Sequence, residues 1–217
     1  MSTKDKIIKT SIMLFNQHGE RAVTTNHIAS HMGISPGNLY YHFKNKEDII
    51  RHIFALYSKH LHTQFVPMAK HDEALVHLTG YLDALFDLMW RFHFFYDNLG
   101  DILSRDEVLK KDYIEFQAAL LSQVREIVIG LREGGMIAID DEDAIELAHM
   151  LKITVSFWTP YIKARRLSGE LMQQDIYNGI LKVLALFKAF GTELSIPKIN
   201  LLREKYSALA AQTEPAS

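Results

Sequence analysis

The chain has 217 residues, no cysteine, a net charge of −2 and 48% hydrophobic residues, a composition typical of one or two globular domains. The absence of cysteine excludes disulfides, thiolate nucleophiles and thiolate metal sites, and it favours a cytoplasmic location. No apolar run approaches the roughly 20 residues that a membrane span needs, and the polar segment 1–9 lacks the apolar stretch of a secretion signal, so we expect neither insertion nor export.

Charge is distributed unevenly along the chain. Residues 1–63 hold eight basic and four acidic side chains, whereas the remainder holds 16 basic and 22 acidic ones. A basic head on an acidic body favours a polyanionic partner for the head, although a small imbalance of this kind is also common on ordinary surfaces.

Helical periodicity predicts two short helices at the start of the chain. Residues 3–18 place their apolar side chains on one face of a helix, and Gly19 follows in the position that commonly ends one. Thr24 can cap a second helix, which Gly33 ends.

A third and a fourth helix follow directly. Ser35 is a good N-cap residue, and Pro36 occupies the first helical position, where a missing N–H costs nothing. This helix closes by Phe43, and Asn45 caps the next one, whose apolar residues recur at helical spacing.

The rest of the chain is also helical, without β-alternation or an internal repeat. We therefore expect an all-α protein with an N-terminal three-helix unit and a C-terminal antiparallel helical bundle. Pro160 should kink its helix. The helices expected in the body span 72–96, 98–105, 107–133, 141–167, 170–190 and 197–211.

The second and third helices have the spacing of a helix-turn-helix, since only Gly33 and Ile34 separate them. Such a unit inserts its second helix into the major groove of DNA. Leu39 and Phe43 lie four residues apart and would face the small core. The other faces of this helix carry Gly37, Asn38, Tyr40, Tyr41 and His42.

These polar positions suit nucleic acid. Gly37 lets the helix N-terminus approach a base or a phosphate closely. Tyr40 and Tyr41 are hard to bury together in so small a unit, and their hydroxyls could reach phosphates while the rings rest on sugars or a thymine methyl. The alternative for both rings is packing against neighbouring helices. Lys46 stands at a helix N-terminus, where its ammonium and the free amides would together attract a phosphate.

Residues 24–49 carry the pattern T…IA…G(V/I)S.G.LY.HF..K..(L/I). This pattern resembles the DNA-binding domain of the tetracycline-repressor (TetR) family, and the resemblance extends over residues 4 to about 55. Met32 replaces the usual alanine and Ile49 a common leucine, both of them conservative changes in a core.

The resemblance implies phosphate contacts from Thr25, Tyr41, His42 and Lys46, and base contacts from the region of Pro36, Gly37, Asn38 and Tyr40. It divides the chain into a DNA-binding domain (1–47), an effector-binding and dimerisation domain (48–211) and a disordered tail (212–217). With the two helix caps included, the expected DNA-binding residues are Thr24, Thr25, Ser35, Pro36, Gly37, Asn38, Tyr40, Tyr41, His42 and Lys46.

Two further kinds of cluster are candidates for ligand binding. His27 and His31 have a spacing that could hold a metal, but no third ligand is near, so we expect solvated surface and no metal or cofactor. Aromatic residues gather at 90–96 and 157–161, either as core or as the wall of an apolar pocket. The candidates for such a pocket are Trp90, His93, Phe116 and Trp158.

The late helices, 141–167 and 170–190, carry more apolar positions than one bundle requires, so we expect a homodimer to form through them. The family resembled also uses its last long helices in this way. The positions concerned are Leu147, Leu151, Val155, Trp158, Ile176, Ile180, Val183, Leu184 and Phe187.

The sequence contains no G-x-S-x-G, phosphate loop, H-E-x-x-H or G-x-G-x-x-G motif, so no enzyme activity is expected. We interpret the chain as a cytoplasmic, homodimeric repressor that binds a palindromic operator in double-stranded DNA and is released by a small apolar or amphipathic effector. Two alternatives stay open: a ligand-dependent activator or co-repressor-type regulator, and a DNA-bound interaction protein with a protein partner.

Overall fold

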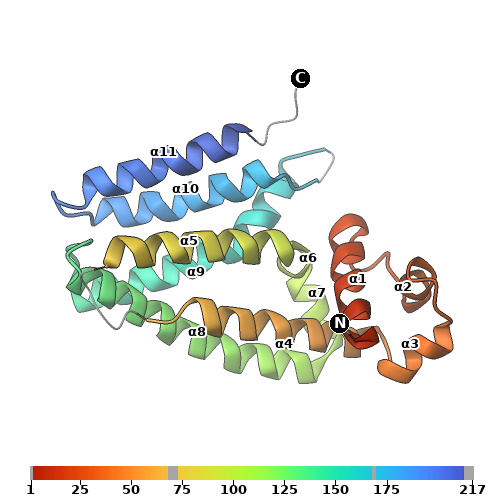
Figure 1. Cartoon of the computed structure of the whole chain (residues 1–217). Coiled ribbons are helices and arrows are strands. Elements are labelled where there is room, and N and C mark those ends of the chain that lie inside the picture. Colours follow the sequence, from red (N-terminus) through yellow and green to blue (C-terminus); the bar gives the residue numbers. More distant parts are fainter. Residues whose placement is uncertain (1, 68–72, 168–169, 213–217) are drawn as a thin grey trace. The chain divides into compact units, whose positions relative to one another are not determined.

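The computed structural model describes residues 2–67, 73–167 and 170–212 (Figure 1). Helices fill most of these ranges, and within them the β structure is limited to one isolated bridge between Ile137 and Gly191. The all-α prediction is confirmed. None of the described helices is long and apolar enough to cross a membrane.

The four N-terminal helices begin and end as the sequence predicts. The side chain of Thr24 accepts the N–H of His27, and the side chain of Ser35 accepts the N–H of Asn38. The N–H of Asp48 donates to Asn45 Oδ1 at 2.8 Å, which confirms the fourth cap. These helices are α1 (Thr3–His18), α2 (Thr25–His31), α3 (Pro36–His42) and α4 (Lys46–Gln64).

The later helices agree with the prediction except where one of them is divided. The helix expected over 72–96 breaks at Phe92, and Asn16 of α1 binds the backbone at this break: its Nδ2 donates to Arg91 O (2.9 Å) and its Oδ1 accepts from Phe94 N (3.1 Å). The predicted start of that helix, 72, lies outside the described residues. These helices are α5 (Ala74–Arg91), α6 (His93–Asp97), α7 (Leu99–Arg105), α8 (Glu107–Glu133), α9 (Asp141–Ala164), α10 (Gln173–Ala189) and α11 (Ile196–Gln212).

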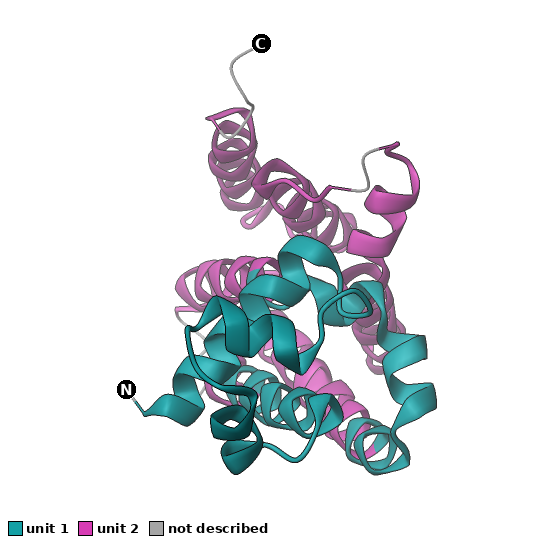
Figure 2. Cartoon of the chain, turned by 90° about the vertical axis from the view of Figure 1, so that its right-hand side faces the viewer, with its two compact units in different colours: residues 1–61, 91–114 teal, residues 62–90, 115–217 magenta. Residues whose placement is uncertain are grey.

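The chain forms two compact units, which Figure 2 distinguishes by colour. The first combines residues 1–61 with 91–114, and the second combines 62–90 with 115–217. This division differs from the expected boundary at residue 47, because the first unit includes α4 as far as residue 61. In the first unit, the three-helix head therefore shares a compact body with most of α4 and with α6 and α7.

Aromatic rings form much of the core of the first unit. Tyr57 of α4 contacts Phe92, Phe95 and Tyr96, and its hydroxyl lies 3.0 Å from that of Tyr96. Burial raises the pKa of Tyr57 and Tyr96 and brings that of nearby Tyr113 to about 12. Phe92, Phe95 and Tyr96 are therefore core residues, which is one of the two roles expected for the aromatic residues at 90–96.

The second unit is a bundle with its core between α5, α8, α9, α10 and α11. Trp158 of α9 lies directly over Gly179 of α10, where an added Cβ would come within 2.7 Å of the ring. The indole N–H donates to the carbonyl of Asp175 at 2.7 Å. Trp158 therefore fixes the packing of α9 against α10.

The residues assigned to the dimer interface proved to be core residues of this bundle. Ile180 and Leu184 have no exposure to solvent, and Val183 is 4% exposed. The excess of apolar positions on α9 and α10 is used inside one chain, because α10 packs against both α9 and α11. The assignment was wrong for the seven buried positions, Leu147, Leu151, Ile176, Ile180, Val183, Leu184 and Phe187, while Val155 and Trp158 are partly buried against the same core.

Candidate nucleic-acid interface

The head presents α3 on a rigid frame. Gly33 adopts a φ of 65°, a left-handed conformation that glycine tolerates readily, and this turn leads from α2 into α3. Ser35 and Pro36 then begin α3 with a side-chain cap and a proline at its start. Leu39 and Phe43 anchor the helix with exposures of 0% and 1%.

The opposite side of α3 is open to solvent. Tyr41 is 85% exposed and Tyr40 is 50% exposed, so packing does not account for Tyr41. The Tyr40 hydroxyl lies 3.0 Å from Thr25 Oγ1, which ties α3 to the first residue of α2. Two aromatic rings on the outer face of a seven-residue helix form a surface suited to sugars, methyl groups and phosphates.

The other residues expected on α3 share this surface. Pro36, Gly37 and Asn38 are exposed, and a Cβ on Gly37 would meet only Ser35 Oγ, at 3.9 Å. Among the described residues, the space around Gly37 therefore permits a close approach to the start of α3. His42 is half-buried, with its ring edge-on to Tyr41 at 5.1 Å.

Lys46 has different partners from the phosphate expected for it. Its Nζ donates to the carbonyls of Glu20 (3.0 Å) and Val23 (3.1 Å), and it forms an ion pair with Glu20 Oε1 at 2.9 Å. The ammonium thus makes two hydrogen bonds and one ion pair within the head. In this structure the Lys46 ammonium holds the connection between α1 and α2 rather than facing outward.

Lys44 is a neighbouring lysine that the sequence analysis did not include among the candidate residues. It is exposed in the short connection between α3 and α4, two residues before Lys46. Its backbone N–H donates to Asp48 Oδ2 at 3.0 Å, which fixes the connection and leaves the side chain at the surface. The signal was present in the sequence, since both lysines flank the capping Asn45, but spacing alone does not show which of them folds inward.

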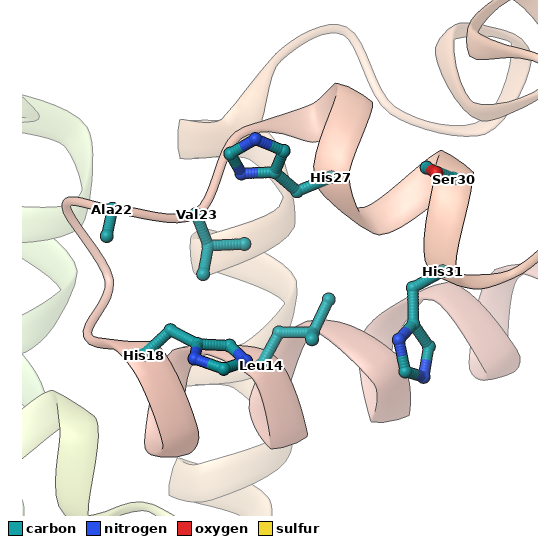
Figure 3. Close-up of a pocket in the computed structure, with 7 residues that line it drawn as sticks. All are labelled: Leu14, His18, Ala22, Val23, His27, Ser30 and His31. Carbon is teal, nitrogen blue, oxygen red and sulfur yellow. The ribbon is translucent and has the colours of Figure 1, made fainter.

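A hollow of about 430 Å³ lies between α1 and α2 (Figure 3). His18, His27 and His31 line it over an apolar floor that includes Leu14 and Val23. His27 Nδ1 accepts the N–H of Thr24 at 3.3 Å, so this ring completes the cap of α2. Among the described residues no three metal-ligating side chains gather closely enough to hold an ion.

The four residues expected to line an effector pocket are divided between the units. His93 belongs to the first, where its Nδ1 lies 3.5 Å from Asp97, whereas Trp90, Phe116 and Trp158 belong to the second. There, Phe116 is buried with its ring against that of His62, and Trp90 and Trp158 pack against the main core. These residues do not line the hollow beside α2.

Two known protein families match the chain. The family described as "Bacterial regulatory proteins, tetR family" matches residues 7–53, and the family described as "Bacterial transcriptional repressor" matches residues 56–195. Because the second match spans more than half of the chain, the protein belongs to the TetR family of bacterial transcriptional regulators.

Individual relatives agree with this assignment. A TetR-family transcriptional regulator of known structure from Marinobacter aquaeolei is 36% identical, with a TM-score of 0.80 over 95% of this chain and 99% of that one. The negative transcriptional regulator IcaR of Staphylococcus epidermidis is 26% identical over 66% of this chain and 77% of IcaR. The matches to YerO and YttP of Bacillus subtilis cover only 16% and 32% of those proteins.

Proposed function

We propose that the protein is a transcriptional repressor that binds an operator in double-stranded DNA as a homodimer and leaves it when a small apolar or amphipathic molecule binds the body. The outer face of α3 is the observation that carries this proposal. Tyr41 and Tyr40 are exposed there while Leu39, between Gly37 and Tyr41, is fully buried, so the helix is anchored by one side and free to enter a groove with the other.

The matched family and a named relative favour repression over activation. The family matched by residues 56–195 is described as a transcriptional repressor, and IcaR is named as a negative regulator. A repressor that blocks a promoter needs only tight, reversible occupancy of its site, which an α3 surface and a dimer would supply.

A row of exposed apolar residues on α9 supports the dimer. Ile153 is 53% exposed, Phe157 64% and Tyr161 50%, and their spacing of four residues places them on one face of the helix. Met150, at 47%, extends the row by one turn. We assign this row, Met150, Ile153, Phe157 and Tyr161, to contact with the same row of a second copy, because a two-fold axis makes one apolar face its own complement.

An apolar effector site in the body is part of this proposal, and the two tryptophans of the chain can report on it. Trp90 is half-buried at the end of α5, and Trp158 lies on α9. Linkage requires the effector and the operator to weaken each other by one common factor, typically about 5–150-fold. An operator-releasing compound that changes the fluorescence of Trp90 in the Trp158→Phe protein would place its site near α5, and one that leaves this fluorescence unchanged would exclude that location.

Selection from random DNA tests the proposal as a whole. Purified protein is incubated with a pool of random duplexes, and bound DNA is recovered, amplified and sequenced. We expect an inverted repeat whose half-sites lie about one helical turn, or a multiple of it, apart. Its affinity should exceed that of an unrelated duplex by about 10³-fold or more and fall steeply with salt. Recovery of no common sequence after repeated rounds would contradict the proposal.

A further inference from the structure

Glu20 is a fully buried carboxylate in the connection between α1 and α2. It has no exposure to solvent, although its neighbours Arg21 and Ala22 are exposed. Removing a carboxylate from water is costly unless cations and hydrogen-bond donors replace the water. The position of Glu20 therefore depends on the residues that surround it.

Two cations from distant parts of the chain bind its two oxygens. Lys46, the first residue of α4, lies 2.9 Å from Oε1, and Arg105, the last residue of α7, donates to Oε2 at 2.6 Å. Lys46 also binds the carbonyl oxygens of Glu20 and Val23. The connection that precedes α2 is thus held by side chains from α4 and α7 at once.

A second set of ionic contacts also links α7 to the connection between α1 and α2. Arg105 also lies 3.0 Å from Asp101 Oδ2, one turn earlier on α7. Arg21, adjacent to Glu20, donates through Nε to that Asp101 oxygen at 3.0 Å. The charges alternate in sign in the order Lys46, Glu20, Arg105, Asp101, Arg21, and we call these five residues the Glu20 network.

We propose that Glu20 and Arg105 are positioning residues for DNA binding, which hold the start of α2 at a fixed place relative to α7. Glu20 lies four residues before Thr24, the cap of α2, and α2 carries α3 through the contact between Thr25 and Tyr40. A displacement of the connection would displace the outer face of α3. This inference rests on the proposed function, since it assigns a role within the same DNA-binding surface.

The charged residues of the Glu20 network are better suited to fixing the orientation of α2 relative to α7 than to stabilising the fold. Apolar residues of similar size can replace a buried ion pair with little loss of stability, whereas charged partners fix which groups meet and at what angle. Arg105 contacts three acids, Glu20, Asp101 and, at 4.0 Å, Glu47. Its five N–H donors have a fixed geometry, so it can hold two elements in one orientation.

The experiment compares specific with non-specific binding in the full-length protein. The probes are the duplex selected by the wild-type protein and an unrelated duplex of the same length. The variants are Arg105→Met, which keeps the aliphatic stem, Glu20→Gln, which keeps the shape, and Arg105→Lys. The matched control is Arg51→Met, because Arg51 also pairs with a buried acid of the same unit, Asp106 at 2.7 Å, but does not contact the connection before α2.

Arg105→Met should lower affinity for the selected duplex by at least about tenfold, the equivalent of one lost base contact. Affinity for the unrelated duplex should change by less than about twofold and the salt slope should stay the same, because Arg105 is paired with Glu20 and Asp101 and is assigned no phosphate contact. Glu20→Gln should behave similarly, Arg105→Lys should restore part of the loss, and Arg51→Met should leave the ratio of the two affinities unchanged. All comparisons refer to protein shown by circular dichroism to be folded at the assay temperature.

Three results would overturn this inference. An unchanged ratio in both Arg105→Met and Glu20→Gln would show that the network does not position α3. An equal fall in the ratio for Arg51→Met would show a general effect of weakening the unit. A flatter salt slope in Arg105→Met would make Arg105 a phosphate contact. Failure of the wild-type protein to select any duplex is a separate outcome, which would remove the proposed function and this role together.

Discussion

The ammonium of Lys46 lies 2.9 Å from Glu20 Oε1, a carboxylate oxygen that water does not reach. The Lys46 ammonium is thus bound inside the head, and we expect the neighbouring exposed lysine, Lys44, to make the phosphate contact instead. The two lysines therefore have different predicted effects when each is removed.

Lys44→Ala should weaken binding to all duplexes about equally and flatten the salt slope by about one unit, since one phosphate contact is lost. Lys46→Ala should instead lower the free energy of unfolding by about 1–3 kcal/mol, because Glu20 keeps Arg105 but loses its other cation. Salt titrations of DNA binding and urea denaturation of both variants measure these effects. A flatter salt slope in Lys46→Ala together with an unchanged denaturation midpoint would reverse the assignment.

Tyr41→Phe should weaken binding at least about tenfold on every duplex, because a hydrogen bond from the hydroxyl to a charged phosphate is worth about 1.5–3 kcal/mol. Asn38→Ala should change which sequences are selected, since Asn38 lies near the start of α3, where base contacts are expected. Tyr177→Phe in α10 is the control, because this ring belongs to the second unit and stacks there on Phe86 at 4.3 Å. Equal affinities for Tyr41→Phe and wild type would remove Tyr41 from the interface.

Phe157→Glu on α9 should raise the dimer dissociation constant at least about 30-fold, the effect of a hot-spot loss of 2 kcal/mol. Sedimentation of dilute samples measures it. Val76→Glu is the control, because Val76 is equally exposed (68%, against 64% for Phe157) on another helix of the same unit. Dimers that persist in a Phe157→Glu, Ile153→Glu double variant would place the interface elsewhere.

Gly179→Ala should destabilise the second unit by about 1–3 kcal/mol, the usual cost of forcing a methyl group into a packed core. The new Cβ would lie 2.7 Å from Trp158 Cδ1, and the hydrogen bond from the indole to Asp175 O holds the ring in place. Thermal denaturation measures the loss. Gly80→Ala on α5 is the control, since a Cβ there meets nothing within 4 Å and should stabilise the helix by about 0.5–1 kcal/mol.

Asp101 should make stability sensitive to acid. Its hydrogen bond from Arg21, with help from Arg105, lowers the pKa of this carboxyl from 3.8 to about 2 in the folded chain. Because the folded pKa is depressed, the stabilisation is present above pH 4 and is lost as pH falls toward 2. Urea midpoints of wild type and Asp101→Asn should differ at pH 5 and converge near pH 2. A constant difference over that range would contradict the pairing.

Local chemistry made the head predictable from sequence. Thr24, Ser35 and Asn45 cap their helices with their own side chains, and these bonds reach only three residues along the chain. The positions of the turn and of the outer face of α3 follow from those caps and from Leu39 and Phe43.

Contacts between residues far apart in the sequence could not be predicted from local patterns. The resemblance singled out Lys46 as a phosphate contact, but in the fold its ammonium is bound by Glu20, 26 residues away, while Lys44 is exposed. Apolar spacing on α9 and α10 predicted buried faces correctly but not which helix would bury them, so Ile180 and Val183 were assigned to a partner chain instead of to their own core.

Two copies of this chain should read inverted half-sites through α3. Hydroxyl-radical footprinting on the selected duplex, combined with the stoichiometry of the complex, measures this. We expect two chains per duplex and protection related by a two-fold axis, with protected positions on one face of the DNA about one turn, or a multiple of it, apart. The Phe157→Glu variant should lose that protection at limiting concentration. One chain protecting a single asymmetric site with full affinity would contradict it.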